Sequence, residues 1–216
     1  MKLTLIMIRT SQTVMEMQMG NLTTAKGVTF FDVETTSLDP SRSAILQIAI
    51  VSDKEDGTQE VWSTKIKPRE VELKFADKQA LKICGYNSKD WEDAPMFEDV
   101  AHEIARRLVW GPVVGHNVQF DISHLTAAFN RRGWKPITRN DNIYNVLENK
   151  EKKYKFGYPA IDTCAMAYVF LPAERQNLDH LRETLDLNTG ASHDALSDAK
   201  ACREVFYHVI NTQLGD

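Results

Sequence analysis

Cysteines and long apolar runs are both scarce in this sequence, and each scarcity excludes a class of protein. The 216 residues include three cysteines, an odd number without a close pair: Cys84, Cys164 and Cys202. This pattern argues against a disulfide framework and against a zinc site, and it fits a reducing compartment. No apolar stretch approaches the roughly 20 residues that a membrane-spanning helix needs. We therefore expect a soluble, cytoplasmic protein without a membrane partner.

An excess of positive charge is also missing. The chain has 26 Lys and Arg against 30 Asp and Glu, a formal net charge of -4. Global positive charge alone therefore cannot hold a nucleic acid, although a local basic path is compatible with the sequence. Lysines and arginines do concentrate in one stretch, between Arg131 and Lys155. The length, with 43% hydrophobic and 26% charged residues, fits one globular domain with a proper core.

The first residues have some of the character of a signal peptide. The apolar stretch from Met1 to Ile8 is short, is interrupted by Thr4 and precedes a Met-rich polar segment without a small-residue cleavage pattern. We interpret residues 1–25 as a cytoplasmic leader outside the domain, either a poorly ordered arm or a segment ahead of a later natural start. The domain then spans residues 26–213, and we expect any protein partner to dock on the domain itself.

The first half of this domain has the pattern of an antiparallel meander. Residues 28–33 form a β-branched and aromatic run that ends in carboxylates, and residues 44–51 form a second apolar run. Residues 59–66 alternate as a third strand, joined to the second by a hairpin through Asp56 and Gly57. Helical patterns follow at residues 76–84 and 97–109.

The second half alternates single strands with helices. Brief strands are expected at residues 112–115 and 160–162, and residues 137–158 are polar, basic and irregular. Further helices are expected at residues 120–130, 163–170, 178–185 and 194–210. The last helix has an apolar stripe formed by Ala195, Ala199, Cys202, Val205, Phe206 and Val209. This order predicts an α/β fold, a mixed sheet flanked by helices.

The first chemical signal is a pair of carboxylates in the first strand. Asp32 and Glu34 are two residues apart, so both side chains project from the same face. Because like charges repel, a cation between them would stabilise the pair, and hard oxygen ligands suit Mg²⁺ or Mn²⁺. Taken alone, the pair is better explained as solvated residues at a strand end, because exposed carboxylates are common.

Two more signals each have an ordinary structural explanation. Asp121 falls in the first turn of a helix, where the helix dipole stabilises a carboxylate. His193 and Asp198 are five residues apart, and at about 100° per residue they would lie on different helical faces. We therefore place His193 in the loop before the last helix, with Ser192 or Asp194 as the N-cap. A histidine in such a loop is usually only a polar surface residue.

Together, the ordered motifs resemble the DEDDh branch of the DnaQ-like exonuclease superfamily, which has a ribonuclease H-like fold. FDVETTSL, VGHNVQFD and HDALSDA match its three motifs in order, and LKICGY and IDTCAMA are similar to its connecting segments. The resemblance covers roughly residues 28–210. It implies a fold with a mixed β-sheet, an antiparallel meander plus parallel strands, flanked by helices.

The resemblance also implies roles for particular residues. Two divalent ions, Mg²⁺ or Mn²⁺, would be held by Asp32, Glu34, Asp121 and Asp198, with Asp32 bridging them. His193 would be the general base, because the sister branch has a tyrosine where this chain has Asp194. The terminal nucleotide would contact Thr35 and Leu38, and the remaining lining residues would be His116, Asn117 and Phe120.

The implied activity is that of a 3′–5′ exonuclease that releases nucleoside 5′-monophosphates from single-stranded DNA, in proofreading, repair or trimming. Phosphodiester hydrolysis needs an attacking hydroxide, charge relief and a stabilised leaving oxygen, and two cations about 3.5 to 4 Å apart supply all three. A histidine titrating near neutrality suits the base. An RNA 3′ exonuclease similar to oligoribonuclease or RNase T is the nearest alternative, because no residue is identified that reads the 2′-hydroxyl. A non-catalytic nucleic-acid-binding module and an endonuclease are the others.

Residues 149–156 interleave basic and aromatic side chains. Such a segment neutralises phosphates and stacks bases in some proteins, so it could track the incoming strand. It could equally be a surface insertion that Tyr154 and Phe156 anchor to the domain. The four tryptophans have no spacing typical of a binding platform, and we expect them in core or boundary packing: Trp62, Trp91, Trp110 and Trp134.

Overall fold

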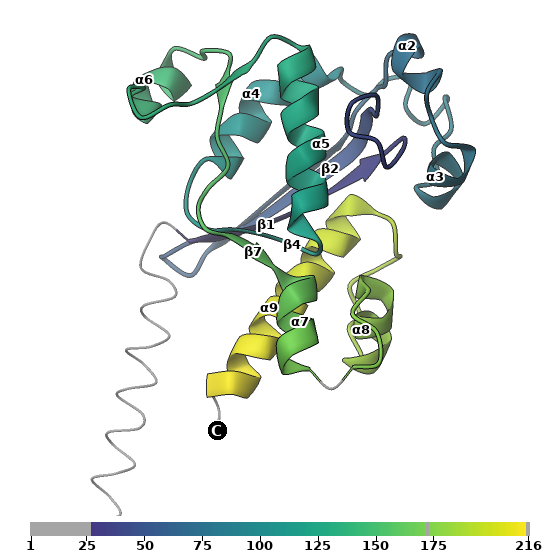
Figure 1. Ribbon diagram of the computed structural model, residues 1–216, viewed down its shortest axis with the longest axis vertical. Helices are drawn as coiled ribbons and strands as arrows, with labels where there is room; N and C mark the ends of the chain where they lie inside the picture. The colour runs from purple at the N-terminus through teal and green to yellow at the C-terminus, as the bar shows by residue number, and fades with distance from the viewer. Residues whose placement is uncertain (1–26, 172, 215–216) are drawn as a thin grey trace, which may run out of the picture.

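Five strands form the main sheet of the computed structural model, which describes residues 27–171 and 173–214. The strands are β1 (Val28–Thr35), β2 (Ile45–Asp53), β3 (Gln59–Lys65), β4 (Val113–Gly115) and β7 (Ala160–Asp162), in the order β3-β2-β1-β4-β7 (Figure 1). The first three are antiparallel, as the meander predicted, whereas β4 and β7 run parallel. The mixed sheet is thus confirmed. The expected leader, residues 1–25, lies outside the described residues.

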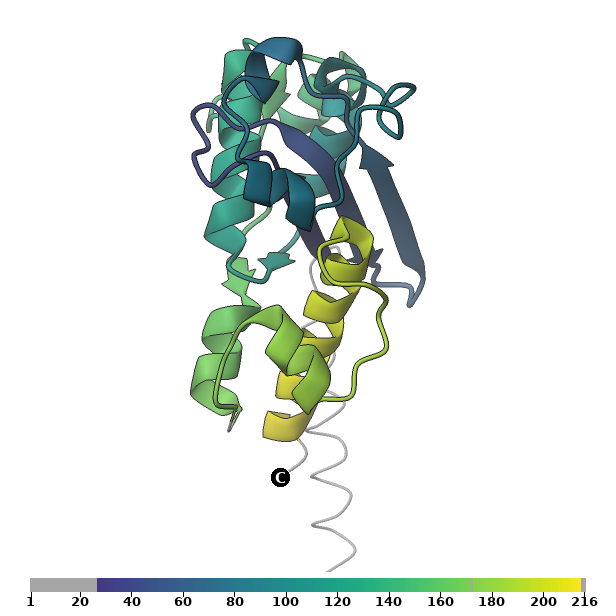
Figure 2. The same ribbon diagram turned by 90° about the vertical axis from the view of Figure 1, so that its right-hand side faces the viewer.

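Helices cover both faces of this sheet (Figures 1 and 2). α4 (Phe97–Leu108) and α5 (Val118–Arg131) pack on the face that carries Phe31 and Val33. α9 (Ala195–Leu214) packs on the face that carries Phe30. Because side chains alternate along a strand, Asp32 and Glu34 share the face of Phe30 and lie on the side of α9.

The apolar stripe predicted for the last helix is buried at every position: Ala195, Ala199, Cys202, Val205, Phe206 and Val209. The N-terminal part of the stripe faces the sheet. Its C-terminal part, with Val205 and Val209, packs instead on α7 (Thr163–Phe170) and α8 (Leu178–Thr184) through Ala167 and Leu181. α9 therefore has two partners, the sheet and a pair of short helices (Figure 2).

The interpretation of residues 137–158 as irregular was wrong in part. The segment contains α6 (Ile143–Glu148), and β6 (Lys153–Tyr154) pairs with β5 (Lys135–Pro136) in a small parallel sheet. Asn142 caps α6 by accepting hydrogen bonds from the backbone N–H groups of Tyr144 and Asn145. Val146 is the buried residue of α6. One buried position does not make a periodic pattern, so the helix could not be recognised in the sequence.

Two further helices lie between β3 and α4. α2 (Glu70–Leu73) was not expected, and α3 (Lys78–Ile83) falls inside the helix expected at residues 76–84. The backbone N–H of Asp77 donates a hydrogen bond to the carbonyl of Thr36 at 2.8 Å. This bond joins the start of α3 to the segment that follows β1. Among the described residues, no helix has the length and the apolar character to cross a membrane.

Candidate active site

The carboxylates of the first motif are partly buried on β1, on the sheet face that α9 covers. Asp32 lies opposite Ala49 of β2, and Glu34 lies opposite Gln47. The register then shifts between Glu34 and Thr35, and the pairing resumes with Thr35 opposite Ile45. The prediction that the two carboxylates share a face is confirmed.

Asp121 is attached directly to this strand. It lies in the first turn of α5, as expected, and is only 2% exposed. Its Oδ1 accepts a hydrogen bond of 3.0 Å from the backbone N–H of Val33, the residue between Asp32 and Glu34. The second motif is therefore held against the first by a bond between segments far apart in the chain.

The third motif brings His193 and Asp198 close to Glu34. His193 lies in the loop before α9, as predicted, with a left-handed backbone at φ 60°. Asp194 caps α9, because its Oδ1 accepts a hydrogen bond of 3.1 Å from the backbone N–H of Ser197. Asp198 follows in the first turn and accepts a 3.2 Å hydrogen bond from the backbone N–H of His193. Glu34, His193 and Asp198 each offer a ligand atom, and these atoms lie within 4.8 Å of one another.

The electrostatics of the site show how crowded its carboxylates are. Burial raises the pKa of Asp32 well above its ordinary value, and Asp121, Asp198 and Glu34 raise it further. Burial also raises the pKa of Glu34 to about 7, with added contributions from Asp198 and Asp194. Each negative charge therefore disfavours the next, and a cation among them would relieve the repulsion.

The pKa values of the other two carboxyl groups, those of Asp121 and Asp198, are also raised, although both groups accept hydrogen bonds that oppose the rise. Burial raises the pKa of Asp121, and the hydrogen bond from Val33 opposes that rise. Burial also raises the pKa of Asp198, against the opposing charge of Arg182. A set of four partly or fully buried carboxylates, all with raised pKa values, fits the oxygen donors that Mg²⁺ and Mn²⁺ prefer.

The residues expected to contact substrate differ in their exposure. Leu38 is 83% exposed, whereas Thr35 is buried and donates its hydroxyl to the Ser37 carbonyl at 3.0 Å. The Thr35 side chain thus supports the loop that carries Leu38. Phe120 is partly buried and lies against His124, with ring centroids 4.1 Å apart.

His116 and Asn117 lie at the junction of β4 and α5. Nδ1 of His116 lies 3.0 Å from the Thr163 hydroxyl, and burial lowers the pKa of His116. Asn117 has an exposed side chain and a left-handed backbone, and its N–H donates to Oδ1 of Asp162 at 3.0 Å. These contacts join the start of α5 to the start of α7, whereas Nε2 of His116 is buried without a hydrogen-bond partner among the described residues.

One residue of the site was missed in the sequence. Arg182 of α8 is 7% exposed and forms an ion pair of 2.6 Å with Asp198. Its sequence signal is weak but present: Arg182 follows Leu178 by four residues and precedes Leu185 by three, which places a charged residue on the apolar stripe of a short helix.

The basic segment, residues 149–156, is fastened to the domain. The Tyr154 ring stacks on Phe129 with centroids 4.7 Å apart and an interplanar angle of 5°. Phe156 packs against the same core cluster. Lys153 pairs with Asp141 at 2.6 Å. These contacts favour the second alternative, a surface insertion anchored by its aromatic residues.

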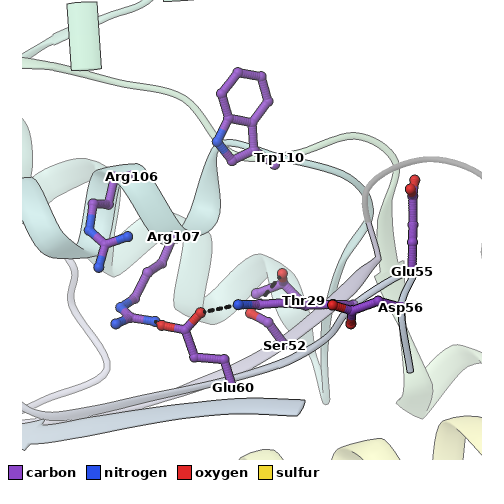
Figure 3. Close-up of a pocket in the computed structure, with 9 residues that line it drawn as sticks. Thr29, Ser52, Glu55, Asp56, Glu60, Arg106, Arg107 and Trp110 are labelled. Carbon is purple, nitrogen blue, oxygen red and sulfur yellow. Dashed lines mark hydrogen bonds and ion pairs between the residues drawn. The ribbon is translucent and has the colours of Figure 1, made fainter. Parts of the chain in front are cut away.

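A separate cavity of about 440 Å³ opens near Thr29, at the amino end of β1 (Figure 3). Three of its charged side chains pair with one another, because Glu60 pairs with Lys54 at 2.7 Å and also with Arg107. Trp110 borders it. Asp32 and Glu34 lie toward the opposite end of the strand, so this cavity is distinct from the candidate site.

The sheet order, the flanking helices and the converging acidic motifs define the class of protein. Residues 29–206 match the family model described as an exonuclease, and the chain belongs to this RNase T family of exonucleases. The resemblance to DnaQ-like exonucleases is thereby confirmed.

Curated relatives agree with this membership. A PolC-type DNA polymerase III from Thermotoga petrophila is 29% identical over 180 residues, which are 83% of this chain and 11% of the polymerase. The chain thus spans about a tenth of the length of the PolC-type relatives. A DNA polymerase III subunit epsilon from Treponema pallidum is 25% identical over 84% of this chain and 75% of that subunit.

Solved structures show the same fold. Exonuclease X in complex with 5′ overhanging duplex DNA matches with a TM-score of 0.57 and 20% identity, over 86% of this chain and 92% of that one. Exonuclease I matches with a TM-score of 0.64 and 17% identity, over 88% of this chain and 42% of that one. At these identities, the likeness concerns the fold.

Proposed function

We propose that this exonuclease hydrolyses the terminal phosphodiester bond at the 3′ end of single-stranded DNA, releases nucleoside 5′-monophosphates, and uses two divalent ions. One observation carries the proposal. The three sequence motifs meet in one anionic site, in which ligand atoms of Glu34, His193 and Asp198 lie within 4.8 Å of one another and Asp121 is bonded to β1. We further propose that residues 26–213 form the exonuclease domain.

The donor set indicates which residues hold the ions. Asp32, Glu34, Asp121 and Asp198 would hold two ions of Mg²⁺ or Mn²⁺. Burial raises the pKa of all four carboxyl groups, and neighbouring carboxylates raise the pKa values of Asp32, Glu34 and Asp121 further, so bound cations would stabilise their charged forms. When bound, a pair of such ions lowers the pKa of the attacking water and neutralises charge on the reacting phosphate. A solved neighbour, S. pombe Pop2p in its Mg²⁺ and Mn²⁺ bound form, supports this choice of ions at 13% identity and a TM-score of 0.61.

His193 is suited to take the proton of the attacking water. Its side chain is about half exposed, at the rim of the carboxylate cluster. An imidazole can accept a proton as a general base and return it as a general acid. The His193 backbone is left-handed, and an imidazole with this exposure would be open to a water molecule and to the substrate.

The substrate proposal has two supports. Leu38 is 83% exposed on the loop after β1, four residues beyond Glu34, and an exposed leucine there would suit an apolar contact with the terminal base. Phe120 would line the same position. The relatives and neighbours named for DNA polymerase III, for Exonuclease X with DNA, and for Exonuclease I with a dT13 oligonucleotide support a DNA substrate and a role in proofreading or repair.

The deciding experiment is a time course on matched 5′-labelled DNA and RNA oligonucleotides with Mg²⁺, Mn²⁺ or EDTA. We expect a ladder of one-nucleotide steps on DNA that EDTA abolishes, and no ladder from the Asp32→Ala variant prepared in parallel. Faster digestion of RNA would replace the DNA assignment with the RNA alternative. Cleavage of a circular single strand would identify an endonuclease, and full activity in EDTA would overturn the metal assignment.

A further inference from the structure

Arg182 reaches from α8 into the candidate active site. The residue lies on the buried face of its helix and is 7% exposed. Its guanidinium Nη2 forms an ion pair of 2.6 Å with Oδ1 of Asp198. Burial of an arginine costs free energy unless its donors are paired, and Nε of Arg182 is buried without a hydrogen-bond partner among the described residues. The contacts of the two Nη atoms therefore indicate what the guanidinium does.

Those contacts fasten the loop before α9 to the first turn of that helix. Nη1 donates to the hydroxyl of Ser192 at 3.0 Å, and Nη2 donates to the hydroxyl of Ser197 at 2.8 Å. The Ser197 hydroxyl in turn donates to the carbonyl of Thr189 at 2.9 Å. Both ends of the loop that carries His193 are therefore tied to one planar group.

Asp198 is held from two sides by the same arrangement. Its Oδ1 accepts from Arg182, and its Oδ2 accepts from the backbone N–H of His193 at 3.2 Å. Rotation of the carboxylate would break one of these bonds. Arg182 and the His193 backbone thus fix the plane of Asp198, and the left-handed turn at His193 depends on the same carboxylate.

The positive charge of Arg182 does not by itself explain its position beside Asp198. A guanidinium beside a proposed cation site repels a divalent ion, so Arg182 opposes ion binding by Coulomb interaction. What it provides is a rigid fork that satisfies three acceptors at fixed angles, which a lysine ammonium cannot reproduce.

We propose that Arg182 is a positioning residue of this exonuclease, which sets the orientation of Asp198 and the conformation of the 189–193 loop that presents His193. This inference rests on the proposed function, because that function gives Asp198 and His193 their roles. Arg182 itself touches neither the reacting atoms nor, in this proposal, the ions.

The test compares Arg182→Lys with a matched control, Arg132→Lys. Arg132 is also a buried arginine, bridging Glu72 and Glu98 at 3.0 Å each. Three quantities are measured for both variants: kcat and KM on a 3′-terminal oligonucleotide, Mn²⁺ affinity by calorimetry without substrate, and amide hydrogen exchange of residues 189–194 in metal-free protein.

For Arg182→Lys we expect a kcat reduced about 10- to 100-fold, the size typical of lost support to a metal ligand. KM should change little, Mn²⁺ should still bind, and exchange in the 189–194 segment should accelerate. Arg132→Lys should keep wild-type kcat and wild-type exchange in that segment. Wild-type kcat in Arg182→Lys would show that charge alone suffices and would overturn the proposal, as would equal losses of kcat in both variants.

The exchange measurement separates the two proposals. If the wild-type protein degrades no oligonucleotide, the proposed function fails, yet faster exchange in Arg182→Lys alone would still show that Arg182 orders the loop. Unchanged exchange in Arg182→Lys would overturn the positioning role whatever the activity. Should the variant unfold, Arg182→Gln, which is uncharged but keeps two donors, takes its place with the same readouts.

Discussion

The backbone N–H of Val33 donates a 3.0 Å hydrogen bond to Oδ1 of Asp121, although 88 residues separate the two. Val33 lies between the carboxylates of Asp32 and Glu34, so this bond sets the height of α5 relative to the acidic pair on β1. It also occupies Oδ1 of Asp121.

We expect Asp121→Asn to separate folding from catalysis. The amide oxygen can still accept from Val33, and removing a buried charge with a raised pKa leaves metal-free stability equal or higher. Turnover should nevertheless be lost, because the amide is a poor ligand for a divalent ion. Urea unfolding and an oligonucleotide assay check both parts. Asp121→Ala should in addition lose about 1 to 3 kcal/mol, since the Val33 N–H becomes unpaired. Wild-type turnover in Asp121→Asn would contradict the ligand role.

Substitution of a carboxylate and substitution of His193 should have different effects on hydrolysis and on Mn²⁺ binding. Asp32→Ala and Asp198→Ala should abolish hydrolysis, and Asp198→Asn should do so while still accepting from Arg182. His193→Ala should lower kcat by about 10²- to 10⁴-fold, which is the typical rate contribution of a general base, and it should still bind Mn²⁺. Calorimetric Mn²⁺ titrations beside the assay distinguish the two classes. Full activity in Asp198→Ala would be incompatible with the assignment.

Leu38→Ala should affect substrate binding without affecting stability. The side chain is 83% exposed, so its removal should change the free energy of unfolding by less than about 0.5 kcal/mol. Loss of an apolar contact with the terminal base should raise KM by about 3- to 10-fold, with kcat nearly unchanged. The control is Val169→Ala, another exposed aliphatic residue, at 67%, on α7. Equal KM values for Leu38→Ala and wild type would remove the proposed contact.

Tyr154→Ala tests the basic segment as an anchored insertion. Tyr154 is buried, stacks on Phe129 and donates its hydroxyl to Asn130 at 3.0 Å. Its removal should lower the free energy of unfolding by about 3 to 5 kcal/mol, as for other large aromatic side chains in a core. Neutralising Lys152 and Lys155 together should leave substrate affinity and its salt dependence unchanged. A flatter salt slope in that double variant would restore the alternative in which the segment tracks the substrate.

Glu60 should contribute stability that depends on pH. Hydrogen bonds from Lys54 and Arg107 lower the pKa of Glu60 from 4.5 to about 2 in the folded protein. Because the folded value is the lower one, the contribution is fully present above pH 4.5 and disappears as the pH falls toward 2. About a third of the side chain is exposed, at 36%, so we expect only about 0.5 to 1 kcal/mol at pH 7. The free energies of unfolding of wild type and Glu60→Gln should be measured as a function of pH. The difference between them should shrink at low pH, and a difference that does not change with pH would contradict the linkage.

Local patterns accounted for much of the fold. The strands at residues 28–33, 44–51 and 59–66 lie inside or within a residue of β1, β2 and β3, and the 163–170 helix has the bounds of α7. Periods of two and of about 3.6 residues are properties of neighbouring residues, so a sequence displays them directly. The same reasoning missed α2 and α6, which have four and six residues, but it found α3, also six residues long, because the turn-forming Gly85 follows that helix.

By itself, the sequence determined the order of the acidic motifs, the shared face of Asp32 and Glu34, and the loop position of His193, since each depends only on spacing along the chain. Only the tertiary structure decided that Val33 binds Asp121, that Arg182 holds Asp198 and that Tyr154 is an anchor. These contacts join segments 16, 24 or 88 residues apart or pack a side chain on another element. Their existence depends on how helices dock on the sheet, and that docking is set by the packing of the whole core.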